Sequence, residues 1–117
     1  MRERLSEDFY SDEFACKGGC GFDTVDYALI TFLQASRDHF DRVHTITSGA
    51  RCEVHNKAVG GSENSQHLVG RAADYVVEGV PAEIAQEFAE QYDIPGLGRY
   101  KDFTHADTRS GGARWEG

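Results

Sequence analysis

Two stretches with apolar residues at helical spacing, separated by short β-rich segments, constrain the fold of this chain most. Residues 24–39 carry one such apolar stripe, and Asp23 or Thr24 is a suitable cap in front of it. Residues 81–92 carry the second stripe, and Pro81 suits the first turn of a helix because its φ is already fixed near the helical value. The sequence therefore predicts two amphipathic helices, each with one face against a core.

The segments between and after these helices have the pattern of short strands. Residues 43–47 and 71–78 alternate apolar and polar side chains and are rich in β-branched types, and a short helix is expected over 51–58. Two more short strands are expected near 98–100 and 103–107, followed by a glycine-rich tail. Short strands joined by loops, with helices first and in the middle, predict an α+β fold with a small antiparallel sheet flanked by helices.

Length and charge limit what the chain can do. The 117 residues suit a single domain, residues 1–117, with residues 1–22 as an N-terminal arm packed on it. A formal net charge of -8 disfavours nucleic acid and anionic membranes as partners. No apolar run is long enough for membrane insertion, and the N-terminal residues do not have the pattern of a signal peptide.

The three cysteines do not form an obvious framework. Their odd number leaves at least one unpaired in any set of disulfides, and Cys16-Lys-Gly-Gly-Cys20 resembles half of a zinc knuckle with no clear second half. Cys52 is too distant in sequence for its position to be inferred. We expect a structural or occasionally disulfide-linked role for these cysteines, and not the main metal site.

A better metal signal comes from His67, Asp74 and His105. A catalytic zinc site commonly uses three protein ligands, imidazoles plus a carboxylate, and leaves a fourth position for water. His67 and Asp74 sit on a predicted loop and the strand that it enters, and His105 sits on a neighbouring strand. This spacing is compatible with one Zn²⁺ ion. The other histidines are expected to be ordinary surface or core residues: His39, His44 and His55.

The residues around these ligands resemble a known family signature. Ser65-x-His67-x-x-Gly70-x-Ala72-x-Asp74, followed by His105-x-Asp107, is similar to the pattern of the zinc D-alanyl-D-alanine carboxypeptidases. That family includes D,D-dipeptidases and the L-alanyl-D-glutamate endopeptidases of phage lysins, and it has the Hedgehog/DD-peptidase fold. The resemblance spans roughly residues 43–109 and includes the lead-in segments Ser48-Gly49-Ala50-Arg51 and Asn56-x-x-Val59-Gly60-Gly61.

The resemblance implies specific roles. It makes His67, Asp74 and His105 the zinc ligands, and it places a catalytic acid/base at Asp102, three residues before the last ligand. Arg51 corresponds to an arginine that faces the substrate and can bind a carboxylate or stabilise an oxyanion. Ser65 is expected to face the same cleft and bind substrate, and Asp107 is expected to orient a ligand imidazole.

The implied function is a zinc metallopeptidase that cleaves a peptide bond in the peptidoglycan stem. Whether that bond joins two D-alanines or L-alanine to D-glutamate is left open by the sequence. The expected protein is a monomer, made in the bacterial cytoplasm and acting on the cell wall after phage-type release. The alternative is a non-catalytic module on the same fold that keeps zinc but serves in binding or in a phage structure.

Overall fold

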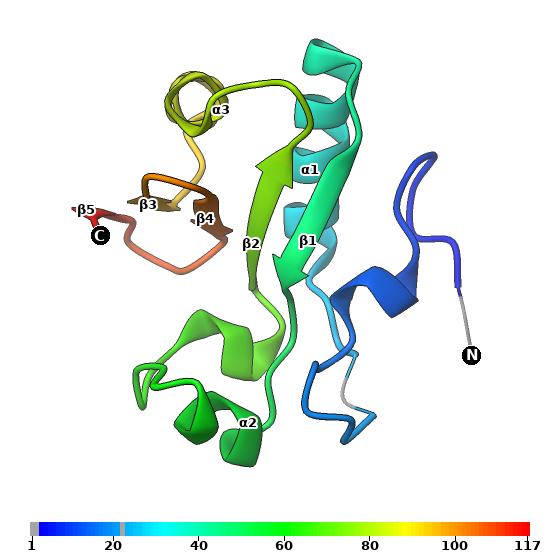
Figure 1. The fold of residues 1–117 in the computed structure, drawn as a ribbon, viewed down its shortest axis with the longest axis vertical. Coiled ribbons are helices and arrows are strands. Elements are labelled where there is room, and N and C mark those ends of the chain that lie inside the picture. The colour runs from blue at the N-terminus through cyan, green and yellow to red at the C-terminus, as the bar shows by residue number, and fades with distance from the viewer. Residues whose placement is uncertain (1–2, 22) are drawn as a thin grey trace.

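A five-stranded sheet organises the computed structural model, which describes residues 3–21 and 23–117 (Figure 1). In chain order the strands are β1 (His44–Ser48), β2 (Ala72–Val77), β3 (Gly96–Arg99), β4 (Thr104–Asp107) and β5 (Ala113–Glu116). Their order across the sheet is β1-β2-β4-β3-β5, and β3 and β5 run parallel while the other neighbours are antiparallel. The α+β prediction is confirmed, with a mixed and mostly antiparallel sheet.

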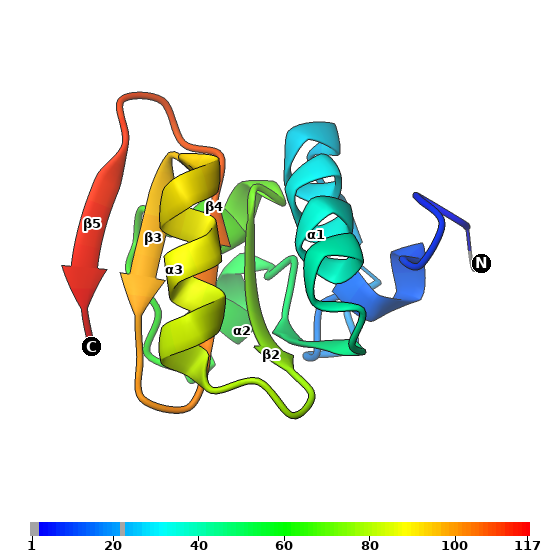
Figure 2. The same cartoon turned by 90° about the horizontal axis from the view of Figure 1, so that it is seen from above.

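The long helices lie together on one side of this sheet. In Figure 2, α1 (Tyr27–Phe40) and α3 (Ala82–Tyr92) lie in front of the strands, and the short helix α2 (Glu53–Ala58) lies behind them. Two 3₁₀ turns, η1 (Ser11–Phe14) and η2 (Gln66–Val69), complete the elements. In the described part of the chain, no helix has the length and apolar character needed to cross a membrane.

The core fills the space between the long helices and the sheet. Leu29, Phe32 and Leu33 of α1 are fully buried against Tyr75 of β2, as the helical stripe predicted. The N-terminal arm joins the same core, since Phe9 and Phe14 are also fully buried. Residues 1, 2 and 22 of the predicted arm lie outside the described residues.

Two helices begin later than the sequence predicted, because long-range hydrogen bonds hold the preceding residues extended. The backbone N–H of Asp26 donates to the carbonyl of Gly70 at 2.8 Å, and α1 starts only at Tyr27. Similarly, the N–H of Arg51 donates to the carbonyl of His67 at 2.9 Å, and α2 starts only at Glu53. Both bonds tie the chain to the loop that carries His67.

The expected glycine-rich tail contains a strand instead. Gly111 and Gly112 both adopt positive φ, which lets the chain turn back after β4. Residues Ala113–Glu116 then pair in parallel with β3 and form an edge of the sheet as β5. This pairing joins segments more than ten residues apart, so local sequence pattern alone did not reveal it.

Candidate metal centre

The register of the sheet brings two of the predicted ligands together. Asp74 on β2 lies directly opposite His105 on β4, and residues paired in this way carry their side chains on the same face. The neighbouring residues Ala73, Tyr75 and Ala106 belong to the core under α1 and α3. Because successive side chains of a strand alternate between faces, Asp74 and His105 point to the opposite face, towards α2 and η2.

His67 reaches this face from the 3₁₀ turn η2. Ser65 caps the turn, and its Oγ accepts a hydrogen bond from the backbone N–H of His67 at 3.2 Å. At the other end, Gly70 adopts a φ of 70°, which ends the turn and directs the chain into β2. The family-like spacing from Ser65 to Asp74 therefore encodes a capped turn, a left-handed glycine and a strand.

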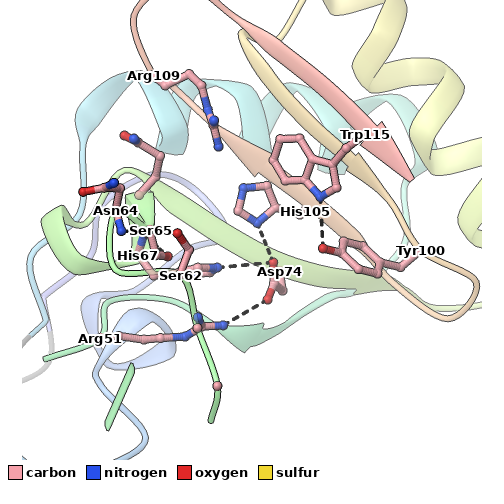
Figure 3. Close-up of a pocket in the computed structure, with 13 residues that line it drawn as sticks. Arg51, Ser62, Asn64, Ser65, His67, Asp74, Tyr100, His105, Arg109 and Trp115 are labelled. Carbon is pink, nitrogen blue, oxygen red and sulfur yellow. Dashed lines mark hydrogen bonds and ion pairs between the residues drawn. The ribbon is translucent and has the colours of Figure 1, made fainter. Parts of the chain in front are cut away.

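The three side chains converge closely (Figure 3). His105 Nδ1 lies 2.9 Å from Asp74 Oδ1, and His67 Nε2 lies 3.4 Å from the same oxygen. One nitrogen or oxygen from each residue lies within 4.8 Å of the others, and all three residues are at most 8% exposed. Two imidazole nitrogens and a carboxylate oxygen in this arrangement are a donor set that suits a catalytic Zn²⁺ ion.

Each imidazole is also held by its second nitrogen. His67 Nδ1 donates to the carbonyl oxygen of Gly49 at 2.7 Å, and His105 Nε2 lies 2.7 Å from Asp107 Oδ2. Such outer partners fix the ring orientation and the tautomer, and they make the inner nitrogen a better ligand. Asp107 thus lies where it can orient His105, the part that the sequence assigned to it.

Hydrogen bonds in the site favour the charged forms of Asp74, His105 and Asp107. Burial raises the pKa of Asp74, but hydrogen bonds from His105 and His67 outweigh burial and lower that pKa to about 2. Burial lowers the pKa of His105, whereas its hydrogen bonds with Asp107 and Asp74 raise it, with a net increase. The pKa of Asp107 falls well below its usual range because its bonds with His105 and Arg109 exceed the effect of burial.

Arg51 lies at the edge of the candidate metal site formed by His67, Asp74 and His105. Its Nη2 is 3.5 Å from Asp74 Oδ2, the carboxylate oxygen turned away from His105, and its Nε donates to Ser48 Oγ at 3.0 Å. A third bond, from Nη1 to Asn56 Oδ1 at 3.2 Å, completes the set of contacts that fix the guanidinium. Arg51 and Ser65 both line the hollow in front of the predicted ligands.

This hollow has a volume of about 480 Å³, and part of its wall was not predicted from the sequence. Tyr100, Arg109 and Trp115 line it, with the Trp115 ring centroid 4.9 Å from that of His105. Trp115 Nε1 donates to the Tyr100 hydroxyl at 3.0 Å, and the Arg109 guanidinium lies over the indole. The sequence signal available was a lone tryptophan in Ala-Arg-Trp-Glu, an alternating segment that falls within the expected glycine-rich tail.

A glycine makes room for this tryptophan. Gly98 pairs with His105 on one side and with Trp115 on the other, so the three residues form one row across the sheet. A Cβ on Gly98 would lie only 2.7 Å from the indole ring. Because Gly98 has no side chain, the indole of Trp115 can lie over β3 and reach His105 on β4.

The structure does not bring Asp102 to this hollow. Asp102 is exposed in the turn between β3 and β4, and it lines a second, smaller hollow with Tyr75 and Ala82. Tyr75 belongs to the core face of the sheet, opposite to Asp74 and His105. Among the described residues that line the first hollow, Asp74 is the one carboxylate. The catalytic role of Asp102 stays a prediction that this geometry does not support.

The comparison with known families agrees with the geometry of the candidate metal site. A family model described as peptidase M15 matches residues 7–107, which is most of the chain and includes all three predicted ligands. The chain therefore belongs to the peptidase M15 family, a family of metallopeptidases. No curated protein matches the sequence closely enough to be compared. The matched range ends before Arg109 and Trp115, so these wall residues lie outside it.

Proposed function

We propose that this chain is a zinc-dependent peptidase that hydrolyses a peptide bond in the stem of peptidoglycan. The observation that carries the proposal is the convergence of His67, Asp74 and His105 in a hollow open enough for a peptide, within an M15 family chain. The cell-wall substrate comes from the resemblance of the motif to the D-alanyl-D-alanine carboxypeptidases. Either stem bond, D-Ala-D-Ala or L-Ala-D-Glu, fits the proposal.

Each residue of the site has a distinct role in such a hydrolysis. A zinc ion held by the three ligands would supply an acidified water and polarise the scissile carbonyl. Arg51, fixed by Ser48 and Asn56, presents its guanidinium beside the ligands, where it can bind a substrate carboxylate or the developing oxyanion. Ser65 lines the same hollow, where its hydroxyl can bind substrate. Proton transfer by Asp102 stays a prediction. Because Asp102 does not line the hollow, the turn between β3 and β4 would have to move for its carboxylate to reach the substrate.

The aromatic wall gives the hollow its selectivity in this proposal. Trp115 and Tyr100 form a flat apolar side next to the polar ligands, joined by their hydrogen bond. Binding sites for small peptides commonly combine such an apolar wall with a few fixed polar groups. The methyl side chains of the alanines that flank either stem bond are small and apolar, which suits packing on this wall.

The test is mass spectrometry of purified stem-peptide fragments incubated with zinc-loaded protein. Products that disappear on chelation, return with zinc and are absent with His67→Ala would establish the peptidase, and their masses would name the bond. His39→Ala, which changes an exposed histidine on α1, is the matched control and should cleave normally. No product from several wall chemotypes, despite zinc bound at His67, would overturn the proposal.

That negative result would favour a non-catalytic zinc module on the same fold. One observation points in that direction, namely the absence of a carboxylate other than Asp74 among the described residues of the hollow. Phage-type release and a monomeric state stay predictions from the sequence, and the experiment above does not depend on either.

A further inference from the structure

The three cysteines, far apart in the sequence, meet in the folded chain. Their Sγ atoms all lie within 4.8 Å of one another, and those of Cys16 and Cys52 are 3.8 Å apart. None of the three forms a disulfide, and Cys16 is buried, Cys52 partly buried and Cys20 exposed. The group joins the N-terminal arm to the start of α2, next to Arg51, and none of the three cysteines lines the hollow in front of His67.

The sulfur spacing suits a metal ion and not a disulfide. A disulfide needs its sulfur atoms about 2.05 Å apart, much closer than the Cys16 and Cys52 sulfurs. Sulfur atoms bound to one tetrahedral zinc at about 2.3 Å lie about 3.8 Å from each other. The distance between Cys16 and Cys52 matches this edge of a tetrahedron.

The backbone around the cysteines supports the same geometry. The N–H of Cys52 donates to Cys16 Sγ at 3.5 Å, a contact that favours a negatively charged sulfur. Between Cys16 and Cys20, Gly19 adopts a φ of 76° in a tight turn closed by a bond from its N–H to the Cys16 carbonyl at 3.2 Å. The turn brings the two ends of the Cys-x-x-x-Cys segment together.

A candidate fourth donor, His55, lies next to the turn, although it is not among the residues whose ligand atoms all lie within 4.8 Å of one another. His55 follows Cys52 by three residues, a spacing that puts both on the same side of the start of α2. Its ring packs against Gly18, where an added Cβ would lie 3.1 Å from His55 Nδ1. Gly18 thus leaves space for an imidazole beside the cysteine turn. Three thiolates and one imidazole are a common ligand set of closed structural zinc sites.

We propose that Cys16, Cys20 and Cys52 bind a second, structural Zn²⁺ ion, with His55 as the fourth ligand. This ion would clamp the N-terminal arm onto the segment that precedes α2. That segment includes Gly49, whose carbonyl accepts the bond from His67 Nδ1. A clamp here would hold one outer partner of the peptidase site without taking part in its chemistry.

Cobalt substitution separates the two centres, because only thiolate ligands give intense charge-transfer absorption with Co²⁺. Protein purified under reducing conditions, stripped with a chelator and titrated with Co²⁺ should bind two equivalents and show this absorption. Cys52→Ser should lose one equivalent and the absorption. Asp74→Ala should lose the other equivalent and keep the absorption, so failure at one centre is distinguishable from failure at the other.

The fourth ligand has its own control. His55→Ala should weaken the cysteine-bound metal and alter the cobalt spectrum, whereas His39→Ala should leave both unchanged. An unchanged spectrum in His55→Ala would overturn the assignment of His55. A single equivalent without charge-transfer absorption in the unmodified chain would overturn the site itself, as would a disulfide that persists in the intact mass after purification under reductant. The unmodified chain gives this answer even if Cys52→Ser does not fold.

Discussion

The two faces of the sheet use the same strands for different purposes. On one face, Tyr75 and Ala106 are sealed under α1 and α3 in an apolar core. On the other, Asp74 and His105 from the same strands face a hollow and hold charges. Each functional side chain is thus one residue away from a core side chain, and the core fixes the strand positions that set the ligand geometry.

The faces also differ in how their polar groups are satisfied. On the site face, both nitrogens of His105 and both nitrogens of His67 have partners nearby. On the core face, the buried hydroxyl of Tyr75 has no hydrogen-bond partner among the described residues. The core face thus tolerates one unpaired hydroxyl, although its histidine, His44, has a hydrogen-bond partner in Ser36 Oγ at 2.7 Å. The following predictions test that division.

The largest effect is expected from Asp74→Ala, which removes the carboxylate that both histidines face. We expect zinc affinity at this centre to fall by more than about 100-fold, because loss of an outer partner alone costs about 10- to 100-fold. Peptidase activity should fall with it. Zinc competition with a coloured chelator measures the change, and Asp38→Ala, an exposed carboxylate on α1, serves as the control. Normal zinc affinity in Asp74→Ala would place the metal elsewhere.

A smaller loss is expected from Asp107→Ala, which removes the outer partner of His105. Zinc affinity should fall about 10- to 100-fold because the imidazole loses its fixed orientation. Asp107→Asn keeps an oxygen acceptor without the charge and should lie between the unmodified chain and Asp107→Ala. Isothermal titration with zinc gives the order of the three proteins. Equal affinities would show that Asp107 serves only to bind Arg109, with which it makes bonds of 2.9 and 2.7 Å.

Gly98→Ala tests whether the wall of the hollow depends on the missing side chain. A Cβ there would lie 2.7 Å from the indole, so Trp115 must move off the row. Overpacking of this kind costs about 1–3 kcal/mol of unfolding free energy. We expect a lower thermal midpoint and a raised KM with little change in zinc content.

On the core face, the prediction concerns pH. Burial lowers the pKa of His44, which is stacked on Tyr75 with its Nε2 2.7 Å from Ser36 Oγ. Below about pH 6.5 the unfolded chain therefore takes up a proton that the folded chain resists, so His44 makes folding stability fall as pH decreases. His44→Gln should flatten the pH dependence of the urea midpoint between about pH 6.5 and the lowered pKa. An unchanged slope would mean that other groups dominate it.

How much of this could be predicted from the sequence depended on the range of the interactions. The capped turn and the strand from Ser65 to Asp74 follow from local residue types, so the ligand loop was predictable. The wall formed by Trp115 depends on parallel pairing of β5 with β3, and the meeting of Cys52 with Cys16 depends on tertiary packing. Neither has a local pattern, and both were missed.

The smallest effect is expected from Asp102→Asn, and this substitution decides between the sequence prediction and the geometry. Asp102 precedes His105 by three residues, an odd spacing that favours opposite faces of an extended segment, and its carboxylate lines the core-side hollow. A general base contributes about 10²- to 10⁴-fold to the rate, whereas from this position we expect a change in kcat of less than about tenfold. Steady-state kinetics on the cleaved stem peptide, with Lys101→Ala as the neighbouring control, measures it. A loss of 100-fold or more, with zinc content unchanged, would show that the turn swings across to the metal during catalysis, and the separation of the two faces would then hold only for the resting protein.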